Sequence, residues 1–292
     1  MIIRILVSVM TYPSLSEKHL ETVCTAGFRE DGSWIRIFPI PYRVIYKDFN
    51  TTRYHKWQWI EVDVEKREQD DRPESFRIRN IDSLKIEEGI LGKVKGKNTD
   101  WEPRIKWMKK NKRIFTNMTE LLELTYQNKL SLAVLKPSQI ICVEACDLRK
   151  KDDGKTIEKY EIKLSKLKAK YQADLQQKKL FEDQQDINDS FRFAEKIPYK
   201  FRYKFLTEDG RERNLMIEDW EIGALYRNCI QIYKDEKRAV QSVIQKYEGY
   251  AKCDTYFFLG TTYEWQKRNS PNPYLIIGVF APPKHRQLSL DF

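Results

Sequence analysis

The chain has 292 residues, of which 41% are hydrophobic and 33% charged, so it can bury a core and is not a disordered polypeptide. Lys and Arg exceed Asp and Glu by 53 to 43, and the formal net charge of +10 favours an anionic partner, above all nucleic acid. Five cysteines form no CxxC pair, and no apolar run approaches the ~20 residues of a membrane helix. These features exclude a disulfide framework and a membrane span, and they predict the reducing cytoplasm.

Short strands separated by turns are expected in the first part of the chain. Residues 2–10 form an apolar run, and 21–40 predict a hairpin around the turn signal Asp31-Gly32. Further strands are expected at 57–66 and 75–80. Several short strands joined by turns predict a small barrel-like sheet.

A helix is predicted over 101–129, followed by a strand over 132–147. From Arg149 to about Ser190 the composition shifts to Lys, Gln, Asp and Glu, with only a thin apolar stripe. This segment is expected to be either a protruding helical hairpin or a mobile insertion.

The second half begins with alternating aromatic and basic residues from 199 to 205, before the turn signal Asp209-Gly210. Helices are expected at 217–232 and 235–249, and strands at 254–262 and 273–280. The predicted fold class is α+β. Its expected parts are a barrel-like β module with a helix (1–148), a charged helical insertion (149–190), an α+β module (191–283) and a tail (284–292).

Aromatic and basic residues occur together in several predicted turns and strands. Trp34 could stack a splayed base while Arg29 and Arg36 hold phosphates, although a core Trp with snorkelling arginines explains the same pattern. The residues expected to contact nucleic acid are Arg29, Trp34, Arg36, Arg43, Lys109, Lys110, Lys112, Arg113, Trp265, Lys267 and Arg268.

Three carboxylates, Glu218, Asp219 and Glu221, stand at the start of a predicted helix, where negative charge is favourable on electrostatic grounds alone. Alternatively, Asp219 with Glu208 or Asp254 could hold a divalent cation for phosphodiester hydrolysis. No spacing establishes such a site. The chain has no Walker loop, dinucleotide-binding glycine fingerprint or HExxH motif, so no metal or cofactor is predicted and the catalytic residues stay unassigned.

The last six residues, Gln287-Leu288-Ser289-Leu290-Asp291-Phe292, follow Pro282-Pro283 and are expected to project as a free peptide. This hexapeptide resembles the bacterial sliding-clamp-binding peptide. The resemblance implies that Gln287 occupies a polar subsite and that Leu288, Leu290 and Phe292 fill an apolar groove on the clamp. The alternative is a strand edge or a tail that packs on its own domain. The stretch 21–36 also resembles a motif of an uncharacterised bacterial family, which implies no mechanism.

The sequence therefore predicts a DNA-binding protein that is recruited to a bacterial sliding clamp, with damaged, modified or foreign DNA as its target. Two alternatives remain open: a clamp-tethered DNA glycosylase or nuclease, and an RNA-binding module.

Overall fold

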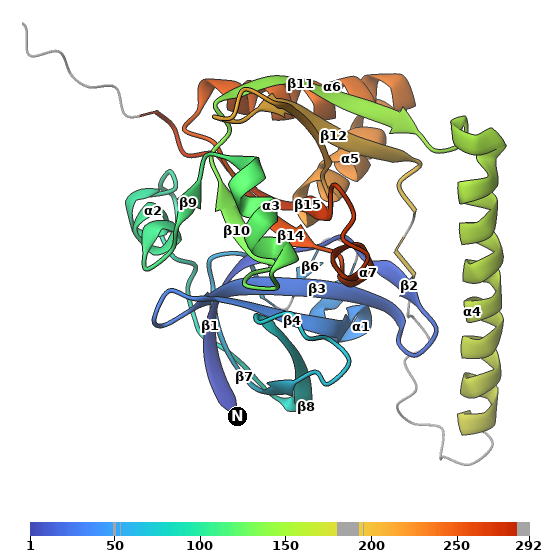
Figure 1. The fold of residues 1–292 in the computed structure, drawn as a ribbon. Helices are drawn as coiled ribbons and strands as arrows, with labels where there is room; N and C mark the ends of the chain where they lie inside the picture. Colours follow the sequence, from blue (N-terminus) through green and yellow to red (C-terminus); the bar gives the residue numbers. More distant parts are fainter. Residues whose placement is uncertain (49–50, 53, 180–192, 195, 285–292) are drawn as a thin grey trace, which may run out of the picture.

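The computed structural model describes residues 1–48, 51–52, 54–179, 193–194 and 196–284 (Figure 1). The predicted α+β class is confirmed: the first part of the chain forms a closed five-stranded barrel, and mixed sheets with helices follow.

The barrel is closed because its first and third strands pair with each other. Its strands are β1 (Ile2–Met10), β3 (Leu20–Arg29), β4 (Trp34–Pro41), β7 (Trp59–Lys66) and β8 (Ser75–Ile86), with β2 (Ser14–Ser16) added beside β3. The hydrogen-bonded order is β1-β7-β8-β4-β3, and β3 returns to β1. Ile5, Ile35, Ile37 and Val62 fill its interior. The β3–β4 hairpin turns at Gly32, whose φ of 89° favours glycine.

Smaller elements lie between barrel strands β4 and β7 and, after β8, between the barrel and the second half. They are α1 (Tyr42–Ile45), β5 (Tyr46–Asp48), β6 (Thr51–Thr52), α2 (Glu102–Lys109), β9 (Ile114–Phe115) and α3 (Met118–Tyr126). The single helix predicted over 101–129 is thus wrong. Asn111 has a φ of 48°, and Asn117 caps a new helix by accepting hydrogen bonds from Thr119 N and Glu120 N at 2.9 and 3.3 Å.

The second half contains two sheets covered by helices. One has the order β15-β14-β10-β9 and the other β11-β12-β13. The strands are β10 (Leu132–Leu135), β11 (Gln139–Asp147), β12 (Tyr199–Leu206), β13 (Glu212–Met216), β14 (Tyr256–Thr261) and β15 (Tyr274–Phe280). The helices are α5 (Trp220–Tyr233), α6 (Glu236–Gly249), the 3-10 turn η2 (Tyr250–Lys252) and α7 (Tyr263–Lys267).

Two strands lie where one was predicted over 132–147. Pro137 lies between β10 and β11, and a proline cannot donate to a strand ladder. The two strands pair with β14 and β12 respectively, so the sheets do not divide at residue 148 as expected. All strands of the barrel sheet precede α2, and all strands of the two sheets of the second half follow it.

The charged insertion begins with the turn η1 (Lys151–Gly154) and continues as one long helix, α4 (Lys155–Lys179). This helix runs along one side of the molecule, outside the sheets (Figure 1). The second arm of a helical hairpin would fall on 180–192, outside the described residues. In the described part of the chain, no helix combines the length and the apolar character that crossing a bilayer requires.

The outer face of the barrel packs against the second half through an apolar layer. Leu6, Phe28 and Trp57 of the barrel half meet Phe258 and Phe280 of the β14–β15 hairpin. The rings of Phe28 and Phe258 are 6.0 Å apart, edge to face. The two halves therefore share a seam, and the cavities described next lie along it.

Candidate functional site

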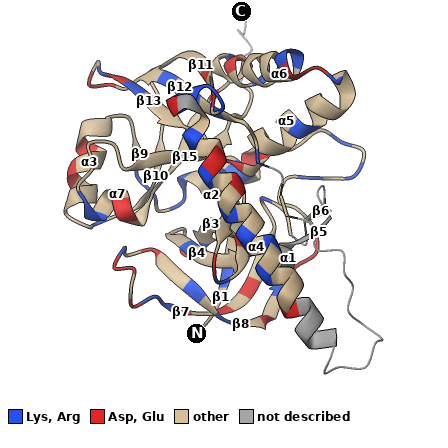
Figure 2. Ribbon diagram, turned by 90° about the vertical axis from the view of Figure 1, so that its right-hand side faces the viewer, with Lys and Arg blue, Asp and Glu red and all other residues tan. Residues whose placement is uncertain are grey.

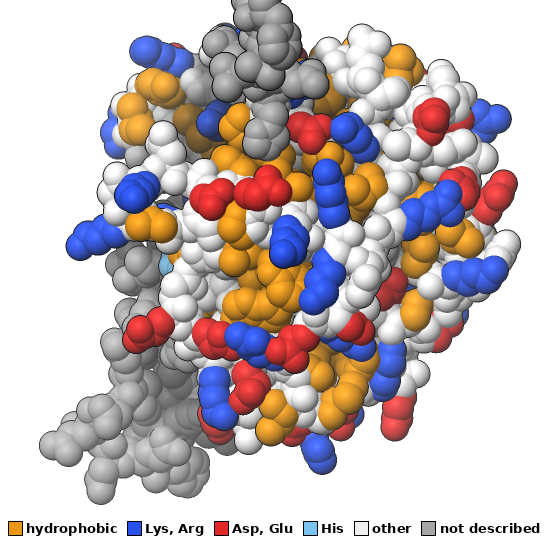
Figure 3. Space-filling view, turned by 90° about the vertical axis from the view of Figure 1, so that its left-hand side faces the viewer, with side chains coloured by type: hydrophobic (Ala, Val, Ile, Leu, Met, Phe, Trp, Pro, Cys, Tyr) orange, Lys and Arg blue, Asp and Glu red, His pale blue; other side chains and the backbone are white. Residues whose placement is uncertain are grey.

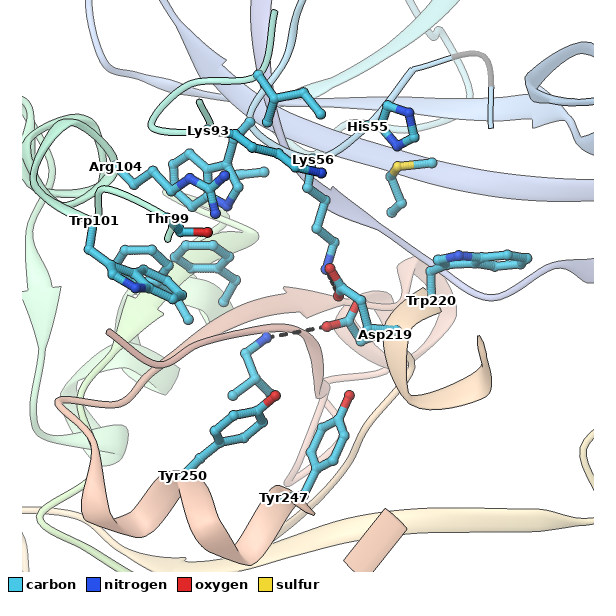
Figure 4. A pocket seen from close by; sticks show the side chains of 18 residues that line it. His55, Lys56, Lys93, Thr99, Trp101, Arg104, Asp219, Trp220, Tyr247 and Tyr250 are labelled. Carbon is cyan, nitrogen blue, oxygen red and sulfur yellow. Dashed lines mark hydrogen bonds and ion pairs between the residues drawn. The ribbon is translucent and has the colours of Figure 1, made fainter. Parts of the chain in front are cut away.

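A cavity lined by charged, polar and aromatic side chains lies in this seam and has a volume of about 480 Å³ (Figure 4). Cavities of this size hold small organic ligands. We call it the seam pocket. Its described lining is Ser8, Met10, His55, Lys56, Trp57, Ile90, Lys93, Thr99, Trp101, Arg104, Asp219, Trp220, Glu221, Tyr247, Tyr250, Phe258, Val279 and Phe280.

A lysine and two carboxylates meet in the seam pocket. Lys56, just before β7, places its Nζ 2.5 Å from Asp219 Oδ1 and also pairs with Glu221. The side chains of Lys56 and Asp219 are 12% and 1% exposed, whereas that of Glu221 is 52% exposed. Asp219 is the N-cap residue of α5, yet its side chain makes no capping hydrogen bond. The acidic helix start is therefore not explained by helix electrostatics alone.

Burial and neighbouring charges shift the pKa values of Asp219 and Lys56. Burial raises the pKa of Asp219 well above its ordinary value, and the negative charge of Glu221 raises it further. Burial alone would lower the pKa of Lys56, but the two neighbouring carboxylates outweigh it and raise that pKa. Lys56 is thus a cation at neutral pH. Because one cation faces two carboxylates, a carboxylate oxygen can still accept a hydrogen bond from a ligand, or a proton bound there can be donated to it.

The opposite wall of the pocket is aromatic and cationic. The Arg104 guanidinium lies 5.5 Å from the centre of the Trp57 ring and 5.6 Å from that of Trp101, and its Nε donates to Leu91 O at 2.7 Å. Figure 4 shows Lys93 and Thr99 on this same side, across from Asp219. The pocket thus combines flat apolar surfaces with positive charge.

Trp57 holds an unusual backbone conformation at this wall. Its φ is 66°, in the left-handed region that bulky side chains rarely adopt. Two hydrogen bonds hold it: Trp57 N donates to Val7 O at 2.5 Å, and Leu91 N donates to Trp57 O at 2.7 Å. Strained residues of this kind cluster at functional sites.

Further polar groups point into the seam pocket. Ser8 is 1% exposed, and its Oγ has no hydrogen-bond partner within the described part of the chain. Such a group is normally satisfied by a ligand or water. The hydroxyls of Tyr247 and Tyr250 point towards Asp219 in Figure 4. The arrangement can donate to and accept from the polar edge of a flat ligand.

The structure corrects the prediction for Arg36. Alternation along β4 is as expected, with Ile35 and Ile37 inside the barrel, but the other face is covered by the second half. Arg36 is 3% exposed and donates to Ser75 Oγ at 3.1 Å and Ser131 Oγ at 2.7 Å. The prediction that Arg36 binds phosphates at the surface is therefore wrong, and the residue ties the two halves together.

The other two residues of that predicted face are also packed. Trp34 is half-buried, with its ring centre 4.5 Å from that of Phe28 and 5.6 Å from that of Phe258. The Arg29 guanidinium lies 5.0 Å from the centre of the Phe76 ring. The core interpretation of this stretch thus describes Trp34 better than the stacking interpretation.

The basic run after α2 fastens the β3–β4 turn. Lys112 Nζ donates to the carbonyls of Gly32, Trp107 and Lys110 at 2.6, 2.9 and 2.8 Å, which uses all three of its donors. Lys110 Nζ donates to Glu30 O at 2.6 Å. Lys112 is thus structural and not a free phosphate ligand.

The remaining predicted residues are not gathered into one site. Lys109 is exposed, and Arg113 pairs with Glu120 at 2.5 Å. Trp265, Lys267 and Arg268 are exposed on and after α7, on the other side of β10 and β14 from α2 (Figure 1). The side chain of Arg43 and the tail residues Gln287, Leu288, Leu290 and Phe292 lie outside the described residues.

The suggested metal ligands do not meet either. Glu208 accepts a hydrogen bond from Thr116. Asp254 forms an ion pair with Lys136 at 2.7 Å, and Asp219 forms one with Lys56. Among the residues that the structure describes, no group of three or more His, Cys, Asp or Glu side chains could hold a metal ion.

The face that carries α2 has a distinct surface pattern. Hydrophobic side chains gather at its centre, and Lys, Arg, Asp and Glu side chains surround them (Figure 3). Apolar surface with a polar rim is typical of binding sites.

Fold and pocket together define an α+β protein in which a closed barrel and a second module enclose a polar and aromatic pocket. The chain belongs to the family of the domain of unknown function DUF8757, whose model matches residues 112–291. The domain of unknown function DUF8758 matches residues 1–110. Searches of the curated proteins and of the solved structures found no match to the chain. The boundary between the two family models falls where the sheets divide.

Proposed function

We propose that the protein binds DNA, takes one nucleotide into the seam pocket, and is brought to DNA by a bacterial sliding clamp. The observation that carries the DNA-binding proposal is the composition of this pocket. A splayed nucleotide needs an aromatic surface for its base, hydrogen-bonding groups for the base edge and cations for its phosphate. Trp101, the pair Lys56–Asp219 and the cations Lys93 and Arg104 offer these three features.

The base edge would face the polar group around Asp219. Lys56 and the orphan Ser8 hydroxyl offer donors there, and the carboxylates of Asp219 and Glu221 offer acceptors. A pocket with buried polar groups discriminates strongly against a ligand that leaves them unpaired. This supports recognition of a particular base, such as one in damaged, modified or foreign DNA.

Two features of the sequence support the rest of the proposal. The net charge of +10 favours a polyanion, and the last six residues resemble a bacterial clamp-binding peptide. A clamp tether raises the local concentration of DNA, so modest affinity for a single nucleotide is sufficient. Both partners place the proposed activity in the cytoplasm.

Binding of fluorescently labelled DNA, followed by polarisation, tests the role of the pocket. Lys56→Met removes the pocket cation, and Lys136→Met is a matched control because Lys136 forms a Lys–Asp pair outside the pocket. We expect Lys56→Met to weaken binding about tenfold or more, as loss of a charge-assisted contact does, and Lys136→Met to leave it unchanged. Equal binding by both folded variants and the wild type would contradict the proposal.

One observation favours a second candidate, a DNA glycosylase. The raised pKa of Asp219 favours the protonated form of this buried carboxyl, which is the form that a general acid needs. The same binding reactions should then be scored for abasic sites and strand breaks. Base loss that depends on Asp219 would establish the enzyme, whereas retention without product would leave the binding protein. RNA of the same length, tested in parallel, distinguishes the RNA-binding alternative.

A further inference from the structure

Five lysines lie on one face of α4. They are Lys155, Lys159, Lys163, Lys166 and Lys170, and all are exposed. At about 100° per residue their spacings of four, four, three and four place them within an arc of about 80°. With a rise of ~1.5 Å per residue, they span about 22 Å along the helix. We call this set the α4 stripe, and Figure 2 looks onto the helix that carries it.

Within the described part of the chain none of the five ammonium groups of the α4 stripe forms an ion pair, although Glu158, Glu161 and Asp174 stand on the same helix. Lys170 Nζ donates a hydrogen bond to Glu17 O at 3.5 Å. Lys155 and Lys159 are four residues apart, as are Lys159 and Lys163, and like charges at this spacing destabilise a helix. A polyanion laid along the stripe would remove this repulsion.

An adjacent side of α4 packs on the body and fixes the direction of the stripe. Leu167 is 4% exposed, and Tyr160 is half-buried. The Lys196 Nζ lies 4.5 Å from the centre of the Tyr160 ring. Tyr160 also lines a second cavity, between α4 and the body of the protein. The side of α4 that carries Leu167 and Tyr160 packs on the protein and is not free to insert into a membrane. The lysines therefore form a cationic ridge on a helix that is anchored to the body along an adjacent side.

We propose that the α4 stripe binds the phosphate backbone of duplex DNA. This inference rests on the proposed function and adds a second contact surface, since α4 contributes no residue to the seam pocket. Its length of about 22 Å matches the axial rise of roughly six base pairs at 3.4 Å each. Phosphate contacts position a protein on DNA without reading its sequence. A pocket that reads a single base does not by itself position the duplex, so the stripe would supply this second function.

The salt dependence of binding tests this directly. Each phosphate contact contributes about 0.9 to the slope of log affinity against log salt concentration. Replacing Lys159, Lys163 and Lys166 together with Gln should lower the slope by about 2.7, so that between about 50 and about 200 mM salt the wild type loses roughly 40-fold more affinity than the variant does. Lys168→Gln is the matched control, because Lys168 is exposed on the same helix, about 140° beyond the edge of the stripe, and should leave the slope unchanged.

Stability and ligand controls separate the outcomes. Loss of like-charge repulsion should leave the melting temperature of the triple variant unchanged or slightly higher, whereas a fall would indicate a structural role and overturn the inference. A wild-type slope in the triple variant, with binding still lost in Lys56→Met, would overturn the stripe and retain the pocket. Stripe-dependent binding to single-stranded RNA or to vesicles of anionic lipid, without binding to duplex DNA, would also overturn it.

Discussion

Removal of the Asp219 carboxylate should strongly destabilise the protein, because Lys56 then loses the buried one of its two counter-ions. Lys56 is only 12% exposed, and its Nζ lies 2.5 Å from Asp219 Oδ1 and also pairs with Glu221. Removing one partner of a fully buried pair costs about 3–5 kcal/mol. Glu221 remains beside Lys56 and is 52% exposed, so solvent and this second carboxylate reduce the loss. We therefore expect Asp219→Ala to lower the free energy of unfolding by ~2–3 kcal/mol.

Urea denaturation at neutral pH measures this loss, and a double-mutant cycle isolates the pair. Adding Lys56→Met to Asp219→Ala should restore part of the stability, because no unpaired charge then remains, with a coupling of ~1–3 kcal/mol. The same cycle on Lys136 and Asp254, which are 44% and 35% exposed, should give at most about 1 kcal/mol. Additive effects at Lys56 and Asp219, or a loss below ~0.5 kcal/mol for Asp219→Ala, would refute the reasoning.

Three further predictions concern pH, the seam and the tail. The raised pKa of Asp219 means that the folded protein binds a proton more tightly, so stability should decline as pH rises from about 4 through the folded pKa; Asp219→Asn should flatten this decline in urea titrations. Arg36→Ala leaves buried Ser75 and Ser131 hydroxyls with fewer partners and should cost ~2–3 kcal/mol by calorimetric melting, and unchanged stability would contradict the tie between the halves. Deleting 287–292 should abolish binding to a bacterial clamp in calorimetry without changing the melting temperature, and Phe292→Ala alone should cost at least ~2 kcal/mol of binding; equal affinity of the full and truncated chains would refute the clamp proposal.

Local patterns predicted the strands and hairpins well. Alternating residues and the Asp31-Gly32 turn predicted β3 and β4, and the second Asp-Gly turn predicted β12 and β13. Closure of the barrel depends on β1 pairing with β3, and a short-strand pattern predicts a barrel without fixing that register.

Contacts across the seam could not be predicted in this way. Arg36 meets Ser131 and Thr261, which lie 95 and 225 residues further along the chain, and only this contact shows that the outer face of β4 is covered. A basic residue beside Trp34 therefore has the same sequence signature whether it faces DNA or a protein interface.

Only some residues of the seam pocket could be predicted from the sequence. The sequence marks Asp219 as one of three carboxylates at a helix start, but its partner Lys56 lies 163 residues earlier, and no local spacing links them. The one available signal is Lys56-Trp57, a charged residue beside an aromatic at the start of the strand predicted over 57–66. The exposed lysines of α4 were equally visible as composition, but their common face required the helix bounds.

Photo-crosslinking tests the central claim, that a nucleotide of DNA enters the seam pocket. Duplex DNA that carries 5-iodouracil is irradiated with the full chain, and the modified peptide is identified by mass spectrometry. The account predicts a crosslink at Trp101 or Trp57, the aromatic residues of the pocket wall, and its loss in Lys56→Met. Crosslinks confined to other parts of the protein, under conditions in which the DNA is fully bound, would contradict it.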